Sequence, residues 1–244
     1  MSVHAQGHYE RLAALFDYPQ WDYPTRAREA CRALEGRYPV AAAELYAFAE
    51  ALPAGRDTTS ADALAEMQDI FTRSFDVQSI TTLSVGYLVF GDDYKRAELL
   101  VNLNREQREA GVDGGSELPD HLPNVLRLLA RWRDRELAAE FIEHVLHPAL
   151  RRMIAEFDTQ RSERRNALYR KHYQTLIDTS ARRGMIFRKP LAALASVLEA
   201  DFGPCERASA ERQHDFLGSI GQELEIEQGT RRGSPELVQL RSPQ

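Results

Sequence analysis

Apolar residues recur at helical spacing through most of this chain, and that pattern restricts its possible folds more than any other feature. Strands are hard to find in it, and only 79–89 is rich in β-branched residues; we expect a loop there, followed by a buried helix. The pattern predicts an all-α fold with one globular domain over residues 1–200 and a flexible tail over 201–244. The helical spacing is clearest after Asp134, at Leu137, Phe141, Ile142, Val145, Leu146, Ala149, Met153, Ile154 and Phe157.

Proline, glycine and capping residues set the expected helix ends. Thr59 and Ser60 are candidate N-caps for a helix that runs to Phe75. Gly111 is expected to stop a helix, and Pro148 to bend one or to start a new one. Further helices are expected at 9–16, 27–34, 40–52, 94–110, 118–132 and 169–177, with a short helical piece at 216–224.

Composition indicates a protein that stays in the cytoplasm. The chain has 244 residues, of which 43% are hydrophobic, which is enough for a substantial core. No apolar run approaches the roughly 18 to 20 residues that span a bilayer, so no membrane insertion is expected. The first residues lack the basic and apolar regions of a signal peptide. Cys31 and Cys205 have neither a metal-binding nor a redox spacing.

Charge argues against nucleic acid as a partner, because the formal net charge is −6 and phosphate binding needs a basic face. The segment 151–189 is a local exception, with eleven Lys or Arg against four acids. Spread around helices, such charges usually form a solvated surface. The other interpretation is a regulatory adaptor that binds a folded partner through this basic face.

Motifs of catalysis are absent or incomplete. Gly86 and Gly91 have the glycine spacing of a phosphate-binding loop, but Asp92 follows where Lys is required. His144 and His147 match neither of the usual helical metal motifs, and no Ser or Cys has the context of a nucleophile. We therefore expect no enzyme. The alternative is a small metal-dependent hydrolase that uses His121 with Asp120, or the pair His144 and His147.

Two unusual segments lie about one helix apart, Gly91 to Arg96 and Glu117 to Pro123. The second places an acid, an imidazole and two prolines within seven residues that separate helical patterns. It is expected to form a rigid polar joint, with Asp120 capping a helix or meeting an arginine of a partner, and His121 tied to the backbone. A joint with this much charge favours a binding edge.

These residues resemble a known family. Phe71-x-x-x-Phe75-Asp76, Gly91-Asp92-x-x-x-Arg96 and above all Glu117-Leu118-Pro119-Asp120-His121-Leu122-Pro123 are similar to the NarJ branch of the NarJ/TorD/DmsD family, the assembly chaperones of dimethyl sulfoxide reductase-type molybdenum enzymes. The resemblance covers roughly 71–132, with a looser helical likeness to about residue 180. Ala97 stands where nitrate reductase chaperones usually carry Gly, and 83–90 lacks their usual His. Both departures point to the chaperones of periplasmic relatives.

The resemblance implies an all-α chaperone with no catalytic role. Its partner would be the apo catalytic subunit of a molybdenum enzyme, or the N-terminal or twin-arginine peptide of that subunit, held until the cofactor is inserted. The molybdenum cofactor belongs to the client, so no stably bound cofactor is expected, and the chaperone would be a monomer or a dimer. The residues expected to bind the client are Asp76, Tyr87, Phe90, Gly91, Asp92, Arg96, Glu117, Pro119, Asp120, His121 and Pro123.

Overall fold

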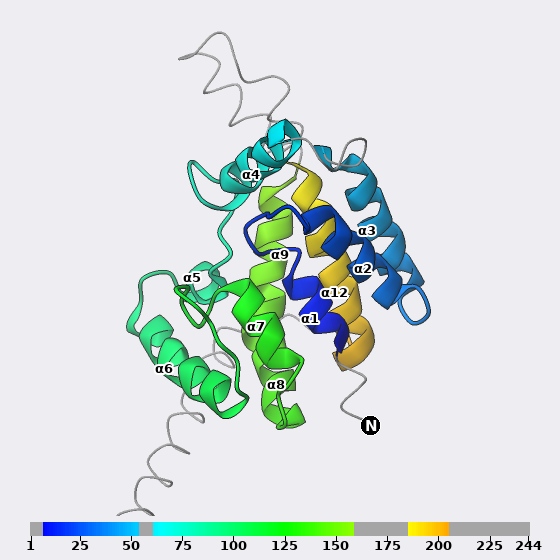
Figure 1. Cartoon of the computed structure of the whole chain (residues 1–244). Helices are drawn as coiled ribbons and strands as arrows, with labels where there is room; N and C mark the ends of the chain where they lie inside the picture. The colour runs from blue at the N-terminus through cyan, green and yellow to red at the C-terminus, as the bar shows by residue number, and fades with distance from the viewer. Residues whose placement is uncertain (1–6, 54–60, 159–184, 205–244) are drawn as a thin grey trace, which may run out of the picture.

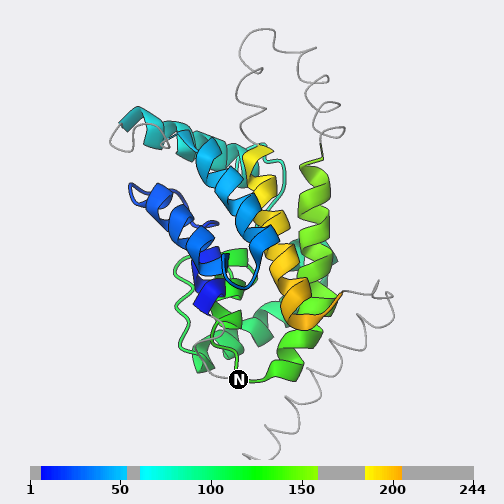
Figure 2. The same cartoon turned by 90° about the vertical axis from the view of Figure 1, so that its right-hand side faces the viewer.

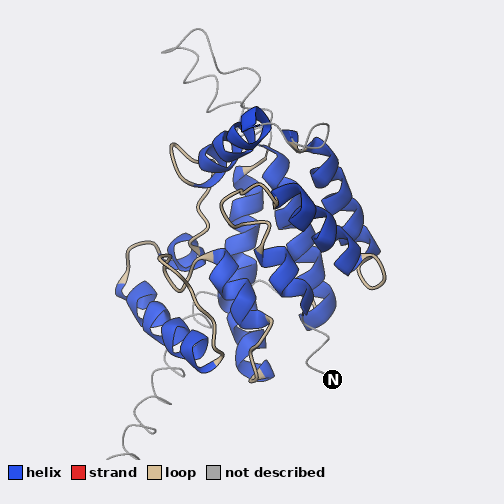
Figure 3. Cartoon of the chain, in the orientation of Figure 1, coloured by secondary structure: helices blue, strands red, loops and turns tan. Residues whose placement is uncertain are grey.

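The computed structural model describes residues 7–53, 61–158 and 185–204, and within these ranges the chain is helical without any strand (Figure 3). The all-α fold is therefore confirmed. No helix in these ranges has the length and apolar character to cross a bilayer. The elements are α1 (Gly7–Ala13), α2 (Tyr23–Leu34), α3 (Pro39–Ala51), α4 (Ala61–Phe75), α5 (Val85–Phe90), α6 (Tyr94–Glu109), α7 (Leu122–Leu129), α8 (Arg135–Phe141), the π-helical turn η3 (Ile142–Leu146), α9 (His147–Glu156), the 3₁₀ turn η4 (Met185–Phe187) and α12 (Arg188–Phe202).

Helix α12 packs between α3 and α9, with α2 on the outer side of α3 (Figures 1 and 2). The core is richest in aromatic rings where η4 meets α3 and α4. The buried ring of Phe187 contacts Phe75 with 4.9 Å between ring centroids, Phe48 with 5.4 Å and Phe71 with 5.6 Å. The contacts with Phe75 and Phe71 are edge to face and the one with Phe48 is tilted, and such aromatic contacts add to the hydrophobic burial of the rings. The end of α4 is thereby fixed to the core.

Several expected helix boundaries are confirmed. The helix ending at Phe75 is α4, and the loop expected within 79–89 is followed by α5. The expected burial of that helix holds only for Val85 and Gly86, since Tyr87 is 44% exposed. Helix α6 ends just before Gly111, which has the positive φ of 65° that ends many helices. Near Pro148 the chain forms the wide turn η3 and then begins α9, where a residue without an amide hydrogen is tolerated.

The helix expected over 118–132 is shorter than its sequence pattern, because α7 begins at Leu122. Leu118 instead opens a turn in which its carbonyl accepts a hydrogen bond from the amide of His121 at 3.0 Å. Pro119 and Pro123 each suit the first turn of a helix. Only Pro123 occupies that position in the structure.

Asp201 and Phe202, which were assigned to the tail, belong to α12 instead. The Asp201 carboxylate accepts hydrogen bonds from Tyr38 Oη at 2.6 Å, Arg37 Nη2 at 2.7 Å and Tyr9 Oη at 2.9 Å, and lies 3.1 Å from His8 Nε2. These contacts place this residue in the folded domain. The expected features at residues 59–60, 169–177, 205–244 and most of the basic segment lie outside the described residues.

Candidate functional site: an acidic groove beside the Pro-Asp-His turn

The turn that carries Pro119, Asp120 and His121 is held against the chain that enters α5. The amide of Val85 donates to the carbonyl of Asp120 at 3.0 Å, and the amide of Leu122 donates to the carbonyl of Leu83 at 2.9 Å. These two bonds flank the antiparallel bridge between Ser84 and His121. Backbone bonds on both sides of His121 fix the direction of its side chain, so this turn is a rigid joint.

Asp120 lies inside the protein and supports this joint from within. Its side chain is 0% exposed, and its Oδ2 accepts a hydrogen bond from Arg96 Nε at 3.0 Å. The guanidinium of Arg96 also lies over the Tyr87 ring, 5.4 Å from its centroid. A buried carboxylate needs such a charged partner, since burial removes its hydration. Arg96 and Asp120 were both expected to contact a client, but here they pair with each other.

The prediction that Asp120 caps a helix is wrong. The N-cap of α7 is His121, whose side chain makes no capping hydrogen bond. Pro123 is buried in the first turn of α7. Neither Asp120 nor Pro123 faces solvent, so both support the site without forming its surface.

Beside His121 lies an open groove with a volume of about 740 Å³, formed by the loop after α1, the end of α4, the start of α7 and the loops around residues 83 and 115. The apolar part of the groove is aromatic, and Tyr18 and Phe71 pack edge to face with 5.7 Å between their centroids. Its aromatic residues are Phe16, Tyr18, Phe71 and Phe75.

Carboxylates surround this aromatic surface. Asp17, Asp76, Asp113 and Glu117 line the groove, and among the described lining residues they are opposed by one guanidinium, that of Arg127. Arg127 Nη2 already donates to Asp17 Oδ2 at 2.5 Å. Neither Asp76 nor Glu117 has an ion-pair partner within the described part of the chain, and both are exposed. The groove therefore has negative charge available for a cationic ligand.

His121 contributes a neutral polar group to the groove. Burial lowers its pKa, and the carboxylates of Glu117, Asp17 and Asp120 offset this only in part. A neutral imidazole offers one hydrogen-bond donor and one acceptor. At pH 7 His121 can therefore bind a peptide group or a polar side chain without adding positive charge.

Two buried amides hold the loops around the groove. Asn124 Nδ2 lies 3.2 Å from the carbonyl oxygens of both Gly114 and Leu118, and Gln107 Nε2 donates to the carbonyl of Pro119 at 2.8 Å. The loop from Asp113 to Pro119 is thus tied to α6 by Gln107 and to α7 by Asn124. The sequence patterns had assigned no role to Asn124. The sequence did contain a sign of its role, because Asn124 is a polar residue at a position where the helical pattern of 118–132 expects an apolar one.

The structure divides the expected client-binding residues. Asp76, Glu117 and His121 share the groove, and Pro119 lies in the loop that borders it. Tyr87, Phe90, Gly91 and Asp92 do not line it, because they belong to α5 and its connection to α6. Of these, Tyr87 is 44% exposed, Phe90 packs partly against the core and Asp92 is exposed with Oδ1 3.9 Å from Arg96 Nη1. Sequence reasoning missed Asp17, Asp113 and Arg127.

The histidine pair considered as a metal site lies on the segment that contains the π-turn. His144 is in η3, and His147 is the first residue of α9, buried with its pKa lowered by that burial. The described residues contain no group of three or more His, Cys, Asp or Glu side chains placed to hold a metal ion.

No family model, curated protein or solved structure matches this chain. The site is therefore defined by its own geometry, an acidic groove with an aromatic surface and a neutral imidazole in an all-α protein.

Proposed function

We propose that this protein is a non-catalytic chaperone of the NarJ/TorD/DmsD type. It binds the apo catalytic subunit of a dimethyl sulfoxide reductase-type molybdenum enzyme, or the N-terminal peptide of that subunit, before the cofactor is inserted. The resemblance at Phe71 to Pro123 gives the family and the kind of client. The groove beside His121 supplies an independent physical reason for binding a peptide.

The observation that carries the proposal is that Asp76 and Glu117, two exposed carboxylates without an ion-pair partner among the described residues, line an aromatic groove. A guanidinium forms short, often bidentate bonds with carboxylates and also stacks on aromatic rings. An arginine-bearing peptide with apolar neighbours would satisfy both parts of the groove. The neutral imidazole of His121 would then help to fix the direction of the peptide.

The test begins with the client that co-purifies from native cells and continues with the N-terminal segment of that client. Titration of this segment is expected to show affinity at least about tenfold lower for a variant with Asp76→Asn and Glu117→Gln, which corresponds to about 1.4 kcal/mol of lost contact. The matched control changes Asp62→Asn and Glu140→Gln, two exposed carboxylates outside the groove. Both variants lose two negative charges, so a general charge effect would weaken them equally.

A second peptide, with its arginines replaced by lysines, tests the chemistry of recognition. Lysine keeps the charge but lacks the planar fork of the guanidinium, so weaker binding is expected. Unchanged affinity of the folded groove variant would contradict the groove as the client site. Co-purification of folded, cofactor-loaded enzyme alone would contradict the role as an assembly chaperone.

A further inference from the structure

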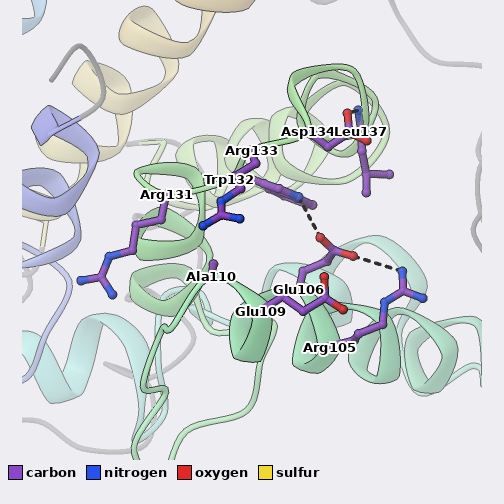
Figure 4. A pocket seen from close by; sticks show the side chains of 9 residues that line it. All are labelled: Arg105, Glu106, Glu109, Ala110, Arg131, Trp132, Arg133, Asp134 and Leu137. Carbon is purple, nitrogen blue, oxygen red and sulfur yellow. Dashed lines mark hydrogen bonds and ion pairs between the residues drawn. The ribbon is translucent and has the colours of Figure 1, made fainter. Parts of the chain in front are cut away.

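A second hollow, of about 270 Å³, lies between α6 and the connection from α7 to α8 (Figure 4). It shares no lining residue with the acidic groove. Helix α6 contributes Glu106 and Glu109 to it, and Trp132 covers it from the connection. A narrower recess lies beside this hollow and shares part of its wall. The residues that line both spaces are Arg105, Glu106, Trp132 and Leu137.

The recess has a volume of about 10 Å³, room for one water-sized group. Its other walls are mostly carbon, from Leu99, Leu103 and Phe141. Asn102 also lines the recess; it is 6% exposed, and its Oδ1 has no hydrogen-bond partner within the described part of the chain. A buried carbonyl oxygen without a donor is costly, so this atom indicates a missing donor.

The other polar side chains that line the recess, Arg105, Glu106 and Trp132, are already engaged with one another. Glu106 accepts hydrogen bonds from Trp132 Nε1 at 3.0 Å and from Arg105 Nη2 at 3.1 Å, as Figure 4 shows. A lone water in the recess would find Asn102 as its main partner, whereas buried waters usually make two to four hydrogen bonds. A hydroxyl group on an aromatic ring is bonded to carbon on one side, so a single hydrogen bond to Asn102 satisfies its donor. The recess therefore suits a hydroxyl, and Trp132 with Leu137 suits the ring behind it.

The mouth of the hollow has charged groups suited to a polypeptide. Arg133 and Glu109 are exposed, and neither has an ion-pair partner among the residues that the structure describes. They can bind the backbone and flanking charges of a segment whose side chain points inward. We propose that this hollow binds a tyrosine side chain of a partner protein, with the phenol hydroxyl donating to Asn102 Oδ1 and the ring against Trp132. Tyrosine is common among residues that anchor protein interfaces.

Trp132 gives a direct test on the full chain, independent of any client. The sequence has two tryptophans, and Trp21 is 58% exposed, so Trp21→Phe leaves Trp132 as the reporter. N-acetyl-tyrosinamide is expected to shift the indole N–H resonance of Trp132 and to bind about five- to tenfold tighter than N-acetyl-phenylalaninamide, the contribution of one buried hydrogen bond. In wild-type protein the same probe should leave the Trp21 resonance unchanged.

Two matched variants assign the hydrogen bond. Asn102→Leu removes the acceptor and should bring the affinity ratio of the two probes to about one. Asn104→Leu, the same change on the exposed side of α6, should keep the ratio. Equal affinity of the two probes in protein that carries only Trp21→Phe would overturn the proposal, even if Asn102→Leu does not fold. Binding of p-cresol without binding of N-acetyl-tyrosinamide would overturn the assignment to a tyrosine side chain.

Discussion

Gly86 and Asp120 lie so close that a β-carbon on Gly86 would stand 2.8 Å from Asp120 Oδ2. The same atom would lie 2.9 Å from Leu99 Cδ2. The absence of a side chain at Gly86 thus lets α5 approach the buried ion pair behind His121. This close contact explains why residue 86 is a glycine. The spacing between Gly86 and Gly91 in the sequence does not explain it.

Gly86→Ala is expected to destabilise the protein by about 1 to 3 kcal/mol, the usual range when an atom is forced into a packed interior. Gly36→Ala is the matched control, because a β-carbon at Gly36 meets nothing within 4 Å. That change should stay within about 0.5 kcal/mol. Urea denaturation of both variants measures the difference, and equal stabilities would contradict the packing described for Gly86.

Asp120→Asn should lower stability by about 1 to 3 kcal/mol, because it leaves Arg96 without its charged, fully buried partner. Asp92→Asn is the control, since Asp92 is exposed and its Oδ1 is 3.9 Å from Arg96 Nη1. An exposed pair of this kind contributes about 0 to 1 kcal/mol. Thermal melts of the two variants should separate clearly; a larger loss for Asp92→Asn would show that Asp120 is not the main partner of Arg96.

Because the Asp201 carboxylate is hydrogen-bonded in the folded protein, we expect the protein to lose stability in acid. Burial by itself raises its pKa, but hydrogen bonds from His8, Tyr38 and Tyr9 outweigh this and hold the pKa at about 2. The ionised Asp201 carboxylate therefore contributes to the free energy of unfolding above the ordinary aspartate pKa, and this contribution is lost as the pH falls toward 2. Stability measured from pH 5 to pH 2 should fall less steeply for Asp201→Asn than for wild type. Parallel curves would contradict a lowered pKa for this carboxyl.

From the burial of His121 we expect stability to depend on pH also in a range nearer to neutrality. Burial lowers its pKa, so the folded protein disfavours the charged imidazole, and protonation below the ordinary histidine pKa of about 6.5 costs stability. His147 acts in the same direction, because burial lowers its pKa too. Melting temperatures at pH 7.5 and 5.5 should differ less for His121→Gln than for wild type. An unchanged difference would assign this pH dependence to His147 or to other groups.

Local chemistry made much of the fold predictable. The stop at Gly111 and the new helix near Pro148 follow from the backbone properties of these residues alone. The start of α7 was not predictable in this way, since Pro119 and Pro123 fit a first helical turn equally well. The choice between them is made by the bond from Leu122 to Leu83, a contact between segments distant in the sequence.

For the site, some of the individual residues could be predicted from the sequence, but their contacts could not. Asp76, Glu117 and His121 were selected from sequence, yet Asp17 was not, because its ion pair with Arg127 joins residues 110 positions apart. Arg96 and Asp120 were also selected, but as separate contacts for a client. Sequence spacing carries no information on whether two opposite charges meet each other or a partner.

The cluster at Asp201 also has a consequence for the order in which this protein opens. The last turn of a helix normally frays first, and its amide hydrogens exchange rapidly with solvent. In α12 that turn carries the carboxylate that binds His8 and Tyr9 of α1 and Tyr38 ahead of α3. Fraying there would break contacts with the start of α1 and the entry to α3 in the same step. The described ends of the chain therefore form one cooperative unit with the core.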